Sequence, residues 1–195
     1  MVSDRVEEPF DVVLEAARVG AGWAAERIWT SLAPRVAGYL RAGGADEPDD
    51  LTSEVFLRVF AGCRSFSGTE AQFRSWVFTV AHSRLVDARR VRNRTPETTS
   101  VEEEGLDVEG PSVAGAEEEA MGRLGTENVQ RLLGVLTCDQ SDVLVLRVLG
   151  RMSVEEAAAV LEKRPGAVSA LQRRGLATLR RRLASEANRH EPWER

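Results

Sequence analysis

Residues 47–60 read EPDDLTSEVFLRVF, and this stretch predicts a helix with two very different faces. Pro48 suits the first turn, where its missing N–H would have no partner, and the acidic residues beside it favour the positive end of the helix dipole. Leu51, Val55 and Val59 recur every four residues, so their side is predicted to be buried. The opposite face carries two carboxylates beside an exposed leucine; these residues alone fit a solvated acidic face, but they also suit a partner. They are Asp50, Ser53, Glu54 and Leu57.

The composition indicates a folded chain that is long enough for one ordinary domain or two small ones. Of its 195 residues, 43% are hydrophobic and 29% are charged, which argues against a wholly disordered protein. No apolar run approaches the roughly 20 residues that span a bilayer. The N-terminal residues are acidic where a signal peptide would be basic. We therefore expect a cytoplasmic protein with no membrane partner.

The residues that usually carry chemistry are few and scattered. Cys63 and Cys138 are far apart, with no Cys-x-x-Cys pattern, so two lone buried thiols are expected rather than a disulfide. His82 and His190 lack a second ligand at metal-binding spacing. We find no phosphate loop, nucleophile elbow or catalytic carboxylate pair. The sequence predicts no enzyme, no cofactor and no metal.

The first half of the chain predicts four helices. Apolar spacing marks helices over residues 10–19 and 23–40, before the helix that begins at Pro48. Thr69 and Gln72 form a capping-box pair, so a fourth helix begins there and ends before Thr95. Its apolar stripe includes Phe73 and Trp76, and its other residues become more basic toward the C-terminus. Such a helix suits DNA, although a packed aromatic stripe with solvated arginines is the alternative.

An acidic segment separates the two halves of the chain. From residue 97 to 125 it combines nine acidic residues with Ser, Thr, Gly and Pro, and its first basic residue is Arg123. Such a segment cannot bury enough apolar surface to offset its chain entropy, so we expect a mostly disordered linker. A solubilising tether and an internal mimic of DNA are both compatible with its composition.

The second half predicts a helix-turn-helix. One helix runs through residues 129–136, and Asp139 or Ser141 is expected to cap the next one. Ser153 with Glu156 forms another capping box, and a tight turn at residues 162–164 leads into a last helix from Pro165 to about residue 184. Gln and Arg can read base edges while Ser and Lys hold phosphates, although a solvated basic helix is the alternative. The candidate residues are Lys163, Arg164, Ser169, Gln172, Arg173 and Arg174.

Three segments resemble the extracytoplasmic-function (ECF) family of bacterial sigma factors. The run DDLTSEVFLRVF at residues 49–60 is similar to the family helix that docks on the clamp helices of the largest polymerase subunit, with Ser53 where members usually carry Gln. FRSWVFTVA at residues 73–81 and RLVD at residues 84–87 are similar to the family's segment for the minus-ten element, with Ser83 where members often have Asn. Residues 161–175 resemble its second DNA-reading module in a form associated with actinobacterial members, with departures at Glu162, Ala167 and Leu171.

The resemblance implies an all-α fold of two small helical domains, a region 2 bundle and a region 4 helix-turn-helix, joined by a flexible acidic linker. The implied domains are residues 1–95 and 126–185, with the linker at 96–125 and a tail at 186–195. The linker would then follow the path of RNA exit from the polymerase. The implied partners are core RNA polymerase, through its clamp helices and flap, and promoter DNA; an anti-sigma factor is left open. Minus-ten contacts would come from Phe66, Arg74, Ser83 and Arg84, and minus-thirty-five contacts from the last helix.

Two other functions compete with a sigma factor that directs promoter-specific initiation. A helix-turn-helix regulator with an N-terminal sensor or dimerisation domain explains the last helix but leaves the acidic docking face unexplained. An adaptor or anti-factor that binds polymerase without DNA fits the acidic linker but not the basic last helix. Taken as a total, the net charge of −5 argues against DNA binding. The distribution of charge along the chain matters more than this total.

Overall fold

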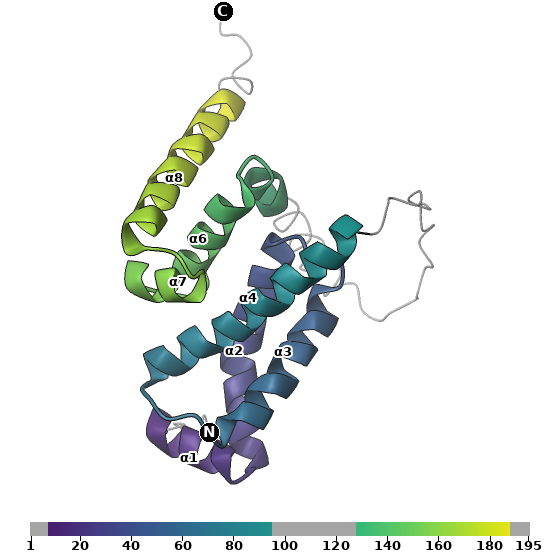
Figure 1. Cartoon of the computed structure of the whole chain (residues 1–195), viewed down its shortest axis with the longest axis vertical. Coiled ribbons are helices and arrows are strands. Elements are labelled where there is room, and N and C mark those ends of the chain that lie inside the picture. The colour runs from purple at the N-terminus through teal and green to yellow at the C-terminus, as the bar shows by residue number, and fades with distance from the viewer. Residues whose placement is uncertain (1–7, 95–127, 188–195) are drawn as a thin grey trace, which may run out of the picture.

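The computed structural model describes residues 8–94 and 128–187, and these residues form helices joined by short loops, with no strand among them (Figure 1). The expected all-helical class is therefore confirmed. The predicted linker at 96–125 and nearly all of the predicted tail lie outside the described residues. Residues 128–133 are also helical. The other helices are α1 (Phe10–Arg18), α2 (Gly22–Ala42), α3 (Pro48–Cys63), α4 (Glu70–Arg94), α6 (Cys138–Val148), α7 (Val154–Val160) and α8 (Pro165–Ala187).

Helices α1 to α4 pack into one bundle around the apolar stripes that the sequence predicts. Val55 and Val59 of α3 are fully buried. From α4, Phe73 and Phe78 enter the same core, and Phe78 meets Tyr39 of α2 edge to face with ring centroids 5.7 Å apart. Burying one face of α3 in this way leaves the opposite face on the surface.

The start of α4 is fixed by the predicted capping box. The backbone N–H of Thr69 donates to Gln72 Oε1 at 2.8 Å, and the N–H of Gln72 donates to Thr69 Oγ1 at 3.3 Å. This reciprocal pair satisfies two N–H groups that the first turn of a helix leaves unpaired. It also sets where the loop between α3 and α4 ends.

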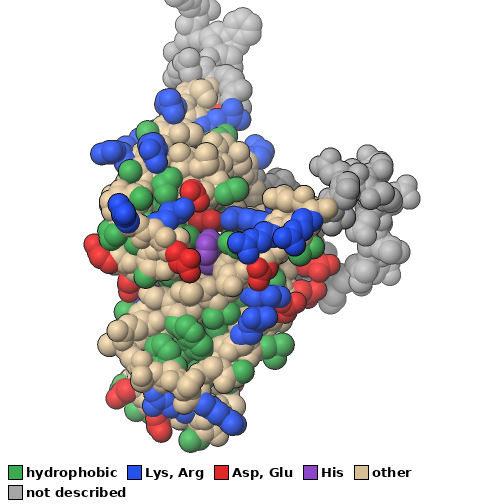
Figure 2. All heavy atoms as spheres, viewed as in Figure 1, with side chains coloured by type: hydrophobic (Ala, Val, Ile, Leu, Met, Phe, Trp, Pro, Cys, Tyr) green, Lys and Arg blue, Asp and Glu red, His purple; other side chains and the backbone are tan. Residues whose placement is uncertain are grey.

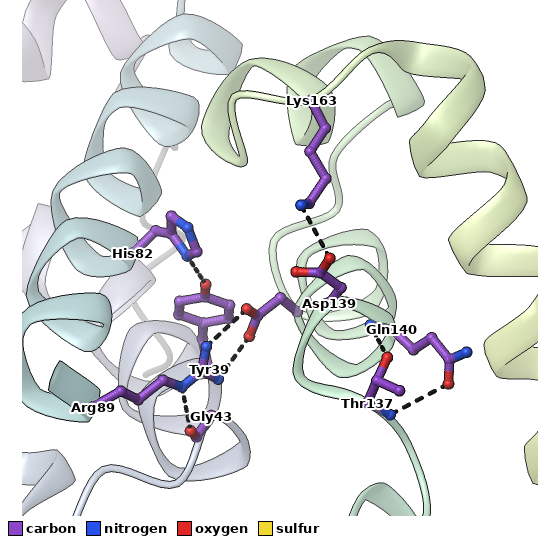
Figure 3. Close-up of polar contacts among 9 residues, drawn as sticks. Tyr39, Gly43, His82, Arg89, Thr137, Asp139, Gln140 and Lys163 are labelled. Atoms are coloured by element: carbon purple, nitrogen blue, oxygen red, sulfur yellow. Dashed lines mark hydrogen bonds and ion pairs between the residues drawn. The ribbon is translucent and has the colours of Figure 1, made fainter. Parts of the chain in front are cut away.

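Helices α6 to α8 form the second unit, and its first cap differs from the prediction. Thr137, rather than Asp139 or Ser141, caps α6 through a capping box with Gln140 (Figure 3). The helix therefore begins at Cys138, which places Asp139 inside its first turn. Ser153 and Glu156 form the predicted capping box of α7. The turn between α7 and α8 contains Glu162 at a positive φ of 52°.

The two units lie against each other, with α6 beside α2 and α7 beside α4 (Figure 1). Gly38 of α2 marks a close approach, since a Cβ placed there would lie 2.9 Å from Leu149 Cδ1. Their buried apolar residues form one continuous cluster. Across the part of the chain that the structure describes, no helix combines the length and apolar character needed to cross a membrane.

Candidate functional site

The predicted docking residues share one exposed face of α3. Asp50, Ser53, Glu54 and Leu57 are all exposed, and Leu57 keeps 71% of its surface in contact with solvent. The Ser53 hydroxyl donates to the backbone carbonyl of Asp49 at 3.1 Å, so it is engaged by its own helix. Asp50 and Leu57 thus present a charged and an apolar group to solvent. This is a surface on which a protein partner could bind.

Among the predicted minus-ten residues, Phe66 is packed within the first unit. Its ring stacks on Trp76, with centroids 5.3 Å apart and planes inclined by 24°, and meets Phe73 edge to face. Its carbonyl accepts a hydrogen bond from Arg18. These contacts fix the loop between α3 and α4. The same contacts agree with the packed alternative for Phe73, which is almost fully buried.

The other three minus-ten candidates differ in what surrounds them. Ser83 is exposed. Arg84 forms an ion pair with Glu54, which links a predicted DNA residue on α4 to a predicted polymerase residue on α3. Arg74 keeps only 19% of its side-chain surface exposed, and its Nη2 lies 3.8 Å from Glu156 Oε1 of α7. The second unit therefore lies over part of the predicted minus-ten surface.

The predicted minus-thirty-five residues lie mainly on the outer face of α8 and the turn before it. Val168 and Leu171 turn inward, and a Cβ at Gly175 would lie 3.0 Å from Leu144 Cδ1, so one face of α8 packs closely on α6. Lys163 is held by Asp139 at 3.0 Å. Figure 2 shows basic side chains gathered over α8 and over the C-terminal part of α4. The remaining candidates are exposed at Arg164, Ser169, Arg173 and Arg174 and half-buried at Gln172.

A polar cluster that the sequence did not reveal joins the two units (Figure 3). Arg89 of α4 donates from Nη1 and Nη2 to the two carboxylate oxygens of Asp142 on α6, both at 2.9 Å. Its Nε donates to the carbonyl of Gly43 at 2.9 Å. Beside this pair, Tyr39 Oη and His82 Nδ1 share a hydrogen bond of 2.7 Å. Arg89 belongs to the increasingly basic C-terminal part of the fourth predicted helix, but its side chain binds the second unit.

Burial and the Asp142 carboxylate together set the charge states in this cluster. Desolvation lowers the pKa of His82 below its usual value and raises the pKa of the Tyr39 hydroxyl well above its own. Burial also acts to lower the pKa of Arg89, but its hydrogen bonds to Asp142 and the Asp142 charge outweigh burial and leave it raised. At neutral pH the cluster therefore holds a charged Arg89 beside a neutral hydrogen-bonded pair.

Acidification is expected to weaken the folded state through His82. Because its folded pKa is lowered, the unfolded chain binds the proton first as pH falls below about 6.5, and stability declines until the folded pKa is passed. Chemical denaturation at about pH 7.5 and about pH 5.5 measures this loss. His82→Gln should lose less stability than wild type between the two; an equal loss would contradict the prediction. The groups acting on His82 are Asp142, Arg89, Glu162 and Lys163.

One of the two cysteines, Cys138, differs from the expectation of two buried thiols. Cys63 is buried, and burial raises the pKa of its thiol. Cys138 is exposed because it occupies the first turn of α6, ahead of the apolar run that enters the core. Both thiols are free. Within residues 8–94 and 128–187, no three His, Cys, Asp or Glu side chains are grouped closely enough to hold a metal ion.

Comparison with known proteins matches both units to sigma-factor families. Residues 28–95 match Sigma-70 region 2, and residues 126–179 match Sigma-70 region 4. The ECF RNA polymerase sigma factor BldN of Streptomyces coelicolor is 30% identical over 178 residues, which cover 90% of this chain and 66% of BldN. The ECF RNA polymerase sigma factor ShbA of Streptomyces griseus is 31% identical over 132 residues, which cover 68% of this chain and 69% of ShbA.

A solved structure supports the same fold. The structure of CnrH in complex with the cytosolic domain of CnrY aligns with a TM-score of 0.64 at 22% identity, covering 89% of this chain and 96% of the other. The chain spans about two thirds of the length of BldN and ShbA. The region 2 match precedes the region 4 match along the chain. This chain belongs to the ECF family of RNA polymerase sigma factors.

Proposed function

We propose that this chain binds core RNA polymerase and directs it to promoters, without catalysis of its own and in the cytoplasm, where polymerase works. The observation that carries the proposal is the exposed face of α3, where Asp50 and Leu57 offer charge and apolar surface together. DNA phosphates would repel these carboxylates, so the face suits a protein rather than DNA. The clamp helices of the largest subunit are the proposed contact.

The DNA contacts are proposed for two separate surfaces. In the first domain, at residues 1–95, the loop before α4 and α4 itself would meet the minus-ten element. In the second domain, at residues 126–185, α8 would enter the major groove at the minus-thirty-five element, while the unit also meets the polymerase flap. The outward set on α8 and the turn before it supports this assignment, because Arg164, Arg173 and Arg174 make no ion pair with another described residue. Each surface alone would bind DNA modestly and in a salt-dependent way.

Run-off transcription with purified core enzyme tests the proposal against its two rivals. Adding the chain should give a promoter-specific transcript that core enzyme alone does not make. An ordinary helix-turn-helix regulator would need another sigma factor, and an adaptor would give no specific start. Gel shifts with the chain alone should give only weak binding at physiological salt. Tight sequence-specific binding by the isolated chain would contradict the proposal.

A further inference from the structure

The contact between the two units is incompatible with reading both promoter elements at once. Elements centred near minus ten and minus thirty-five are separated by about 25 base pairs, or roughly 85 Å along the duplex. In this structure α7, which leads directly into α8, packs on α4. The DNA-reading end of α8 is therefore within about two helix diameters, roughly 20 Å, of the first unit. The units must separate before both elements are bound.

The same contact covers a residue that the first unit would use for DNA. Arg74 is mostly buried, and its guanidinium faces Glu156 of α7 at 3.8 Å. Glu156 also caps its own helix through Ser153, so its carboxylate is held in place. A carboxylate at this point takes the position of a phosphate relative to Arg74. The packed arrangement thus withdraws part of the predicted minus-ten surface.

The Arg89–Asp142 pair has the properties of a latch for this arrangement. Asp142 keeps 5% and Arg89 keeps 17% of its side-chain surface exposed, and the pair is bidentate. Removing one partner of a buried pair with this geometry strongly destabilises the contact between the units, because the other charge stays buried without compensation. Asp142 makes no other side-chain hydrogen bond among the described residues. Its contribution is therefore specific to the contact between units, whereas Arg89 also holds the Gly43 carbonyl.

We infer that this chain inhibits itself through a closed state in which Arg89 and Asp142 latch the second unit onto α4, and that the latch must open for promoter binding. The inhibitory part of this inference rests on the proposed function. Polymerase then binds the fraction of chains that are open, so the latch lowers apparent affinity by that fraction. Changing Asp142 alone should raise the open fraction without altering α4, which is proposed to meet DNA, or the face of α3 that is proposed to meet polymerase.

Small-angle scattering on the full free chain tests the latch directly. Asp142→Arg places two cations together and should increase the radius of gyration, while the helical content stays unchanged. The charge swap Arg89→Glu with Asp142→Arg should reverse most of that increase. Asp11→Arg, an exposed change of the same charge on α1, should leave the radius at the wild-type value. An Asp142→Arg chain as small as wild type would overturn the latch.

Transcription at limiting chain concentration tests the inhibition. Asp142→Arg should initiate roughly three to ten times faster than wild type, with the difference vanishing at saturation. An expanded variant that initiates no faster would overturn self-inhibition. If wild type and every variant failed to initiate at any promoter, the proposed function would fall and self-inhibition with it, while scattering would still decide whether the latch exists.

Discussion

Reversing the charge of Asp50 and Glu54 to lysine is expected to lower the affinity for core RNA polymerase by about a hundredfold or more. Both carboxylates lie on the exposed face of α3 beside Leu57. Like charges placed against a cationic partner surface cost several kcal/mol, and central contacts carry most of the binding energy of an interface. Fluorescence anisotropy with labelled chain and purified core enzyme measures the change. Unchanged affinity would show that this face of α3 does not bind polymerase, and the proposed function would lose its main support.

The two positions need separate variants because Glu54 has a second contact. It forms an ion pair with Arg84, so its reversal also sets two cations against each other within the first unit. Asp50 makes no such pair with a described residue, which makes Asp50→Lys the cleaner single change. Glu26→Lys, at an exposed position of α2, serves as the control with the same charge change. Thermal melting should place Asp50→Lys and Glu26→Lys close to wild type.

The bundle of α1 to α4 could be predicted because its information is local. Val55 and Val59 repeat at helical spacing, and the structure buries both. Thr69 and Gln72 mark the start of α4, and this signal lies within the four residues 69–72. These signals depend on periodicity and on side chains that bond to nearby backbone, and both can be read along the chain.

The cap of α6 shows how such signals can compete. Thr137, Asp139 and Ser141 are all good capping residues, so residue type alone does not select one. Thr137 is followed three residues later by Gln140, and this spacing is the signal that would have identified the cap. The position of Cys138 follows from the same choice, because a helix that begins there leaves its first turn in solvent.

The cluster between the two units had no comparable signal. Arg89 and Asp142 are 53 residues apart with the acidic segment between them, and several other arginines on α4 were equally good partners by sequence. One part of the cluster could be suspected from the sequence. An acidic residue beside the apolar run 143–146 needs a partner once it is buried. Only the fold identifies that partner as Arg89.

Replacing Arg173 on α8 by alanine is expected to show whether its side chain reads a base or holds a phosphate. Arg173→Ala should reduce initiation at a promoter that depends on the minus-thirty-five element by roughly tenfold to a hundredfold, which corresponds to about 1–3 kcal/mol for a bidentate base contact. Run-off assays on promoters with single substitutions in that element measure it. Arg181→Ala, an equal loss of charge at an exposed position two turns farther along α8, is the matched control.

The pattern across promoters then assigns the role of Arg173. If it reads a base, the variant loses discrimination at one position and keeps it elsewhere. If it holds a phosphate, activity falls by the same factor at every promoter. The slope of log affinity against log salt concentration then becomes shallower by about one. Gln172→Ala should show only the first pattern, since a neutral amide releases no counterion. Full activity of Arg173→Ala at every promoter would show that this face of α8 is simply solvated, the alternative that its sequence allows.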